Sequence, residues 1–243
     1  MKKLISLILL LPLSSFAQVT QIDETSCSTP TTNGPDVVFS CSPVINPPPP
    51  EPEPAYSRVV AFGDSWTDDD RYTPWAERLA NDLGIPITNF AVSGARSWQI
   101  EQQVAQAVSQ GIDPDALYTY WIFPNDFYDY PNPFSALPAV EQNAYDAFEM
   151  LVNAGAQNIL ILSLPDGENY PLFSGFQSTG TQLTDGANNA VGNAAVQFGL
   201  SMYDSESFLN AILDGCGSSC WWDQQHMAPE IHDQLAQEIS EDL

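Results

Sequence analysis

The chain has 243 residues, 44% of them hydrophobic, and its six basic residues stand against 31 acidic ones, which gives a net charge of −25. So acidic a protein repels phosphate backbones and anionic bilayers, because binding to nucleic acid depends on lysine and arginine. The composition therefore excludes nucleic acid as an expected partner and favours a neutral ligand.

Residues 1–17, MKKLISLILLLPLSSFA, have the layout of a cleavable secretory signal peptide. Lys2 and Lys3, the only lysines in the chain, precede an apolar run that ends in small residues. The run is short for a bilayer crossing, and no later segment is long and apolar enough for one. We therefore expect a secreted or periplasmic protein whose mature chain has no integral membrane span. Retention of the run as a membrane anchor is the alternative.

Residues 18–54 are expected to be a Cys-containing N-terminal segment that ends in a Pro-rich linker. The stretch NPPPPEPEP at 46–54 favours extended polyproline geometry and acts as a semi-rigid spacer. Cys27 and Cys41 precede it, and two cysteines this close in an exported chain are more typical of a disulfide than of metal ligands. The segment is compatible with a tail of no separate activity and with a small binding module.

Residues 55–243 form one predicted domain, in which apolar runs alternate with segments of helical spacing. The runs lie at 58–62, 86–92, 116–123 and 158–164, with a weaker fifth near 199–203. Near-continuous apolar runs are typical of strands that are buried on both faces of a parallel sheet. The pattern predicts an α/β fold with three layers, α/β/α, around a mostly parallel sheet of about five strands.

Helical spacing is found between these runs, at 73–84, 97–111, 139–155 and 185–199. Each of these segments ends at a glycine that suits the position just after a helix. A closing helix is expected at 228–240, with Pro229 near its start. His232, within this last helix, is expected to face solvent.

Polar residues follow three of the predicted strands, at 63–66 (GDSW), 93–96 (SGAR) and 124–126 (PND). Ligands of open α/β sheets bind beyond the carboxyl ends of the strands, so these positions are the first candidates for a site. A fourth polar segment, CWWDQQH at 220–226, lies near the C-terminus.

These four segments resemble, in order and approximate spacing, the sequence blocks of the GDSL or SGNH hydrolase superfamily. The resemblance spans residues 58–243 and depends on all four blocks together, since GDS alone is a common tripeptide. No GxSxG nucleophile elbow is present, so the rival α/β-hydrolase assignment lacks its usual support. The resemblance implies a flavodoxin-like fold and a serine ester hydrolase that needs neither a metal nor an organic cofactor.

The resemblance implies that Ser65 is the nucleophile and that Asp223 and His226 complete a catalytic triad. A serine hydroxyl needs a base to react at neutral pH, and His226 is one of only two histidines. The backbone amides of Ser65 and Gly94 and the side chain of Asn125 are implied to form an oxyanion hole.

Each of these residues also has a structural interpretation. Ser65 is alternatively a helix cap, His226 a packed structural histidine, and Asn125 a turn residue. Asp64, next to the implied nucleophile, is expected to be a structural residue that binds nearby backbone amides.

Two positions depart from the pattern of the family. Phe123 stands where the third block usually has glycine, two residues before Asn125, and Trp66 is bulkier than the small aliphatic residue often found after the nucleophile. We predict that both side chains form walls of the substrate pocket. Phe123 is expected either to narrow the acyl pocket or to shift the loop that carries Asn125.

Cys216 and Cys220 lie just before the segment of Asp223 and His226, and they are expected to form a second local disulfide that restrains it. A zinc site is not expected, because the two cysteine pairs lie far apart in the sequence and only His226 is near either of them.

The expected substrate is a small-molecule, lipid or carbohydrate ester. The leading prediction is hydrolysis of lipid or short-chain acyl esters, and a carbohydrate acetylesterase of the same fold is the alternative. A non-catalytic surface binding or adhesion protein, displayed by the Pro-rich spacer, is the alternative from another class.

Overall fold

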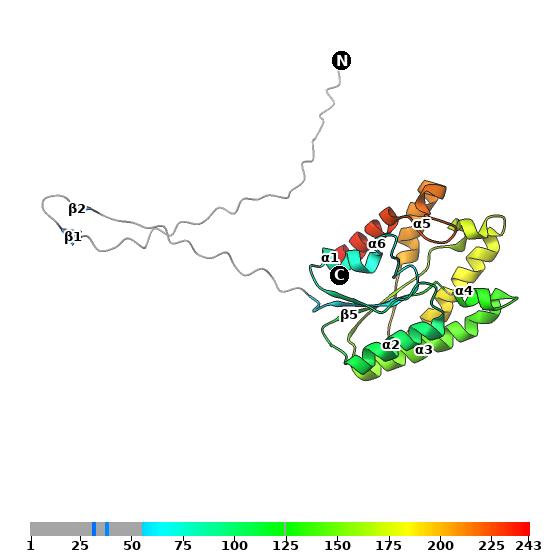
Figure 1. Cartoon of the computed structure of the whole chain (residues 1–243), viewed down its shortest axis with the longest axis horizontal. Helices are drawn as coiled ribbons and strands as arrows, with labels where there is room; N and C mark the ends of the chain where they lie inside the picture. Colours follow the sequence, from blue (N-terminus) through cyan, green and yellow to red (C-terminus); the bar gives the residue numbers. More distant parts are fainter. Residues whose placement is uncertain (1–30, 33–36, 39–54, 124) are drawn as a thin grey trace, which may run out of the picture. The chain divides into compact units, whose positions relative to one another are not determined.

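The computed structural model describes residues 31–32, 37–38, 55–123 and 125–243 (Figure 1). The chain divides into two compact units, Met1–Pro52 and Glu53–Leu243. In the first unit, β1 (Thr31–Thr32) pairs antiparallel with β2 (Val37–Val38). The expected signal peptide, the Pro-rich linker and the expected Cys27–Cys41 disulfide lie outside the described residues.

A five-stranded parallel sheet with the strand order β4-β3-β5-β6-β7 forms the centre of the second unit. The strands are β3 (Val59–Gly63), β4 (Ile87–Asn89), β5 (Leu117–Trp121), β6 (Asn158–Leu162) and β7 (Met202–Tyr203). Every residue of β3 and β5 is buried, because helices cover both faces of the sheet. All five strands overlap the apolar runs of the sequence.

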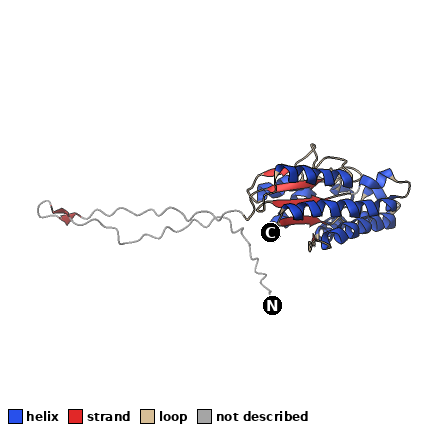
Figure 2. Cartoon of the chain, turned by 90° about the horizontal axis from the view of Figure 1, so that it is seen from below, coloured by secondary structure: helices blue, strands red, loops and turns tan. Residues whose placement is uncertain are grey.

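Six α-helices are present in the described residues. They are α1 (Trp75–Asp82), α2 (Ser97–Gln110), α3 (Leu137–Ala154), α4 (Gln177–Val196), α5 (Ser205–Cys216) and α6 (Pro229–Asp242). Figure 1 shows α1 and α6 on one side of the sheet and α2 and α3 on the other, and in Figure 2 helices lie over the strands. The α5 helix packs with the α1 and α6 layer, and α4 contributes to both hydrophobic layers. The predicted three-layer α/β/α fold is confirmed.

Two helices differ from the sequence pattern. The α5 helix was missed, although Asp204 caps its N-terminus by accepting a hydrogen bond from the Ser207 N–H at 3.0 Å. The α4 helix begins eight residues earlier than the expected start at 185, at Gln177, in a stretch of weak helix formers. Tertiary packing stabilises this first part, where Gly180 lies so close to the Gly167 backbone that a Cβ atom would collide with it.

The expectation that His232 faces solvent is wrong, because α6 buries this side chain completely against α1. Its Nδ1 accepts a hydrogen bond from the Trp75 N–H at 3.3 Å, and its Nε2 lies 3.1 Å from the Tyr72 hydroxyl. Burial lowers the pKa of His232 to about 3, so the imidazole is neutral in the folded protein near neutral pH.

Within the described ranges, none of the helices combines the length and the apolar character that crossing a bilayer requires.

Candidate active site

The turn that follows β3 holds Ser65 at the carboxyl edge of the sheet. Gly63 ends the strand, and a Cβ atom there would lie 2.6 Å from the Trp121 carbonyl oxygen, so the close approach of β3 and β5 requires glycine. The carbonyl of Asp64 accepts hydrogen bonds from the backbone N–H groups of Thr67 and Asp68 at 3.0 and 2.9 Å. Ser65 therefore lies in a tight turn, with 4% of its surface exposed.

The side chain of Asp64 stabilises this turn through hydrogen bonds. Its buried carboxylate accepts hydrogen bonds from the Trp66 N–H at 3.0 Å and from the Phe123 N–H at 2.8 Å. Complete burial raises the pKa of Asp64 to about 7, although the same backbone donors lower it. Asp64 is thus a structural residue that ties the Ser65 turn to the segment after β5.

Ser65, His226 and Asp223 form a continuous chain of hydrogen bonds. The Ser65 Oγ lies 2.8 Å from His226 Nε2, and His226 Nδ1 lies 2.8 Å from Asp223 Oδ2. Because Nδ1 faces a carboxylate, the proton of a neutral imidazole resides there, which leaves Nε2 free to accept from the serine hydroxyl. This arrangement can transfer a proton from the serine to the histidine.

A short hairpin-like segment carries Asp223 and His226. Trp221 and Met227 form an antiparallel bridge, and the Trp222 N–H donates to the His226 carbonyl oxygen at 2.8 Å. At the base of this segment, the Ala228 N–H donates to the Cys220 carbonyl oxygen at 2.7 Å, and a disulfide joins Cys216 to Cys220. The backbone pairing and the disulfide together restrain the segment that presents the histidine.

Charge and backbone donors surround the carboxylate of Asp223. Burial by itself raises the pKa of Asp223, but the backbone N–H groups of Gln225 and His226 and the imidazole of His226 hold it well below its ordinary value. Arg71 Nη1 lies 3.2 Å from Asp223 Oδ2 and also pairs with Asp69. The aspartate therefore stays ionised beside the histidine.

Arg71 was missed in the sequence, because no motif of the family marks it. The one available signal was its rarity, since it is one of four arginines in residues 55–243 and follows Ser65 by six positions.

The three expected oxyanion donors differ in the hydrogen bonds that they make within the protein. Among the described residues, neither the Ser65 N–H nor the Gly94 N–H has a hydrogen-bond acceptor, and Gly94 adopts a positive φ of 77° that favours glycine. The side chain of Asn125 is buried, and its Nδ2 donates to the Ala95 carbonyl oxygen at 2.9 Å and lies 3.4 Å from Asp64 Oδ2. In this state the Asn125 amide therefore donates one hydrogen bond to the backbone and a longer one to the carboxylate of Asp64.

The predicted pocket residue Trp66 lies in the hydrophobic core. It is 1% exposed, and its ring packs against Trp121, Phe123 and Tyr170 at centroid distances of 4.7, 5.9 and 5.6 Å. Its indole N–H donates to the Gln225 carbonyl oxygen at 3.1 Å. The core thus accommodates the large ring that follows Ser65, and the Trp66 indole is hydrogen-bonded to the segment of His226.

Phe123 lies at the end of the segment after β5 and lines an apolar pocket, together with Phe127 and Leu183. The side chain is 2% exposed, so it contributes to the inner part of this pocket.

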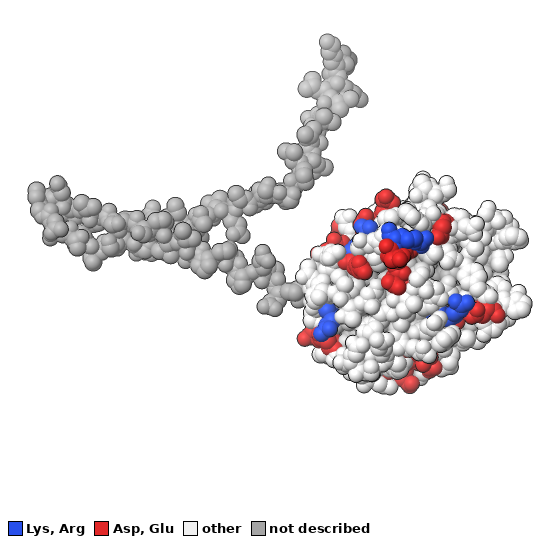
Figure 3. All heavy atoms as spheres, in the orientation of Figure 1, with Lys and Arg blue, Asp and Glu red and all other residues white. Residues whose placement is uncertain are grey.

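The basic side chains of the domain are all neutralised by acidic ones. Arg58 pairs with Asp113, Arg71 with Asp69 and Asp223, Arg78 with Asp233, and Arg96 with Asp129. On the face shown in Figure 3, each blue basic cluster touches red acidic side chains. The remaining acidic residues give the domain its excess of negative charge.

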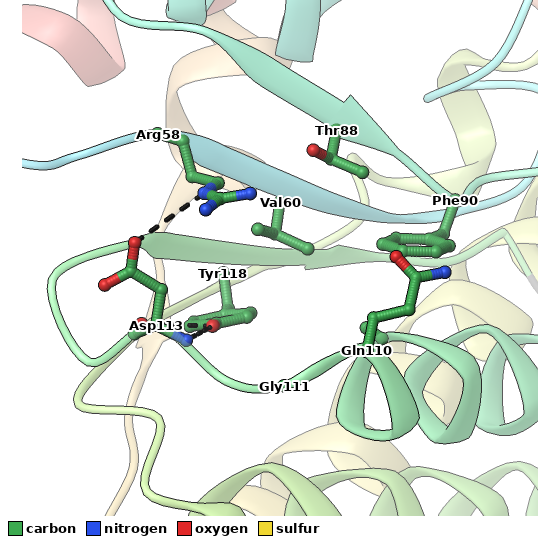
Figure 4. Close-up of a pocket in the computed structure, with 9 residues that line it drawn as sticks. Arg58, Val60, Thr88, Phe90, Gln110, Gly111, Asp113 and Tyr118 are labelled. Atoms are coloured by element: carbon green, nitrogen blue, oxygen red, sulfur yellow. Dashed lines mark hydrogen bonds and ion pairs between the residues drawn. The ribbon is translucent and has the colours of Figure 1, made fainter.

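A separate hollow of about 130 Å³ lies at the other end of the sheet. Figure 4 shows it between the first residues of the strands and the end of α2, with Arg58 paired to Asp113 at 3.6 Å. Its lining contains no nucleophile with a neighbouring base, and it lies at the amino ends of the strands. It is therefore not part of the candidate active site.

A parallel α/β sheet that carries a Ser–His–Asp hydrogen-bond chain at its carboxyl edge has the architecture and the site of a serine hydrolase. The chain matches the model of the GDSL-like Lipase/Acylhydrolase family over residues 59–239. It belongs to this family.

Two curated proteins resemble part of the chain. A phosphatidylcholine-sterol acyltransferase from Aeromonas hydrophila is 29% identical over 157 residues, which cover 48% of this chain and 47% of that protein. A thermolabile hemolysin from Vibrio parahaemolyticus is 28% identical over 112 residues, which cover 41% of this chain and 26% of that protein. The matched region thus spans less than half of each relative.

Solved structures of the family share the fold. A lipolytic protein of the G-D-S-L family from Veillonella parvula has a TM-score of 0.61 at 15% identity, covering 76% of this chain and 99% of that one. An acetyl-xylooligosaccharide esterase from Geobacillus stearothermophilus has a TM-score of 0.63 at 16% identity, covering 78% of this chain and 96% of that one.

Proposed function

We propose that this chain is an exported serine ester hydrolase that cleaves neutral carboxylic esters through an acyl-enzyme on Ser65. The observation that carries the proposal is the 2.8 Å contact between Ser65 Oγ and His226 Nε2, with Asp223 bonded to the other ring nitrogen. In this proposal His226 is the general base and acid, and Asp223 orients it and stabilises its protonated form.

In the acylation step, Ser65 Oγ attacks the carbonyl carbon of the ester while its proton moves to His226 Nε2. The carbonyl oxygen becomes an oxyanion, and the proposed donors to it are the backbone N–H groups of Ser65 and Gly94 and the amide of Asn125. When the tetrahedral intermediate collapses, the bond between the carbonyl carbon and the alcohol oxygen breaks. His226 then gives its proton to the departing alcohol, which leaves Ser65 acylated.

In the deacylation step, water takes the place of the alcohol. His226 removes a proton from the water as it attacks the acyl carbon, and the bond between that carbon and Ser65 Oγ then breaks. The proton on His226 returns to the serine, and a carboxylic acid is released. The two steps together consume one ester and one water and return Ser65 and His226 to their starting protonation states.

The expected substrates are neutral, since the four arginines of the domain are all paired and the surface is acidic. The name of the Aeromonas relative refers to acyl transfer from a phospholipid, which supports esters of lipid-like acyl groups as the first class to test. The layout of residues 1–17 supports export to the periplasm or the medium, with residues 18–54 as a segment and linker that precede the hydrolase domain.

The test compares the wild type with Ser65→Ala on p-nitrophenyl acetate and octanoate, with Ser109→Ala as the matched control because Ser109 is exposed on α2. We expect hydrolysis to be lost in Ser65→Ala and unchanged in Ser109→Ala. A fluorophosphonate is expected to label the wild type at Ser65 and to leave Ser65→Ala unlabelled.

The alternatives give different results. A binding or adhesion protein would neither react with the fluorophosphonate nor hydrolyse any ester. A carbohydrate acetylesterase would release acetate from acetylated xylo-oligosaccharides much faster than it cleaves octanoate.

A further inference from the structure

An apolar pocket of about 240 Å³ lies beside the segment that carries Asp223 and His226. Its walls come from the end of the β5 segment, from η1 (Asn125–Asp129), from η4 (Pro171–Phe173) and from α4. They are mainly aromatic and aliphatic: Phe123, Phe127, Tyr128, Leu172, Phe173 and Leu183. Of the described residues that line this pocket, none carries a charge, so it suits a hydrocarbon group.

Hydrogen bonds connect one wall of the pocket to the His226 segment. The Tyr128 hydroxyl donates to Gln225 Oε1 at 2.6 Å, and the Leu172 N–H donates to the Gln224 carbonyl oxygen at 2.8 Å. Gln224 and Gln225 are the two residues between Asp223 and His226. The segment that carries the proposed base is therefore also hydrogen-bonded to two residues that line the pocket.

Another residue of the lining, Phe123, is connected to the turn that holds Ser65. The Phe123 N–H donates to the carboxylate of Asp64, the residue before Ser65, and Phe123 also precedes the proposed oxyanion donor Asn125 by two positions. Phe123 thus lines the pocket and also belongs to the segment that is hydrogen-bonded to the turn of Ser65.

The side chains that line the pocket range from buried to exposed. Phe123, Phe127 and Leu183 are 2%, 7% and 2% exposed, whereas Tyr128 is 55% exposed. The alcohol of an ester must leave to solvent before water can attack, whereas the acyl group stays attached to the serine through both steps. An apolar pocket whose lining is hydrogen-bonded to the segments of Ser65 and His226 therefore fits the acyl group better than the alcohol.

Because this argument depends on the proposed ester hydrolysis at Ser65, it names the acyl class of that same site. We infer that the pocket binds the acyl chain of the substrate and selects medium-length chains over acetate, because it is apolar and has a volume of about 240 Å³. An acetyl group would leave most of this pocket unfilled.

The first part of the test is the acyl-chain series of p-nitrophenyl esters from acetate to laurate with the wild type. We expect kcat/KM to rise by about fourfold for each methylene that enters the pocket, to reach its maximum at hexanoate or octanoate, and to fall for laurate.

The second part fills the pocket with Leu172→Trp. Leu172 is half-buried in η4, and the matched control is Leu83→Trp, at a half-buried leucine that follows α1 and lines no part of this pocket. We expect Leu172→Trp to lower kcat/KM for octanoate at least tenfold, to leave acetate within about twofold, and to move the maximum to shorter chains. Leu83→Trp is expected to keep the wild-type profile.

Two results would overturn the acyl assignment while ester hydrolysis itself stands. One is a profile that is flat or highest at acetate in a wild type that fluorophosphonate still labels at Ser65. The other comes from a series of alkyl acetates, in which the alcohol chain is varied: if Leu172→Trp alters that series and not the acyl series, the pocket binds the alcohol. Failure of the wild type to cleave any ester, with no labelling of Ser65, would instead overturn the proposed function and this inference with it.

Discussion

Arg71 Nη1 lies 3.2 Å from Asp223 Oδ2, the oxygen that also faces His226 Nδ1. The same guanidinium pairs with Asp69, so it links the segment after Ser65 to the segment that carries the proposed base. The side chains of Arg71 and Asp223 are 35% and 39% exposed. Ion pairs with this exposure contribute about 1 kcal/mol or less to the stability of the fold. Arg71 is therefore expected to act by positioning Asp223.

The Arg71→Ala variant is expected to lower kcat by about two- to tenfold with little change in KM, because it loosens Asp223 without touching the substrate. Arg58→Ala is the matched control, since it breaks a surface ion pair with Asp113 away from the site. Equal kcat values for Arg71→Ala and Arg58→Ala would show that Arg71 has no positioning role.

The oxyanion role proposed for Asn125 predicts that Asn125→Ala loses about 100- to 1,000-fold in kcat at nearly constant KM. The variant also loses the buried hydrogen bond to the Ala95 carbonyl oxygen, which stabilises the fold by about 1 kcal/mol. Asn158→Ala is the control, because it removes an amide that donates to the Pro114 carbonyl oxygen at the amino end of β6. Similar losses of stability in both variants, with loss of kcat only in Asn125→Ala, would support the role. Unchanged kcat in Asn125→Ala would exclude it.

The Cys216–Cys220 disulfide closes a short ring just before the segment of Asp223 and His226. In the loop-closure model a ring of this size stabilises the fold by about 2 kcal/mol, so the double variant Cys216→Ser, Cys220→Ser is expected to unfold at lower urea concentration. We also expect kcat to fall several-fold, because the hairpin-like segment keeps its backbone pairing and loses its covalent restraint. If urea unfolding and kcat both equal those of the wild type, the disulfide does not support the site.

The burial of His232 leads us to predict that the free energy of unfolding depends on pH. Its pKa is about 3 in the folded protein and close to 6.5 in an unfolded chain, so below pH 6.5 only the unfolded state takes up a proton. Stability is therefore lost as the pH falls from 6.5 towards 3. Relative to His232→Gln, the wild type is expected to lose about 2 kcal/mol of unfolding free energy between pH 7.5 and pH 5.

Denaturant unfolding of both proteins at the two pH values measures this difference. Asp64, whose pKa is raised to about 7, contributes with the opposite sign, because the folded state favours its protonated form. Asp64 is present in both proteins, so its effect cancels in the comparison. Parallel pH profiles for the wild type and His232→Gln would contradict the assignment to His232.

Much of the fold could be read from local patterns. The five strands overlap the apolar runs because a strand buried on both faces must be apolar along its whole length, as in β5 (Leu117–Trp121). Helix ends were also readable, since Gly155 follows α3 with a φ of 99°. The start of α4 and the whole of α5 could not be predicted from local patterns, because the stability of these segments comes from packing more than from helix propensity.

The sequence by itself determined the α/β class, the edge of the sheet where a site must lie, and the residue types at that edge, including Ser65, Asp223 and His226. These features follow from periodicity and from residues near strand ends, which are local properties of the chain.

Only the tertiary structure decided which side chains meet. Ser65 and His226 are 161 positions apart, and the 2.8 Å contact between them depends on the packing of the Trp66 ring and on the backbone pairing of Trp221 with Met227. The same holds for the pairing of Arg71 with Asp223 and for the burial of His232. Sequence periodicity specifies which face of an element is buried, but not which element covers it, and that choice fixes the partners, the pKa shifts and the shape of the pocket.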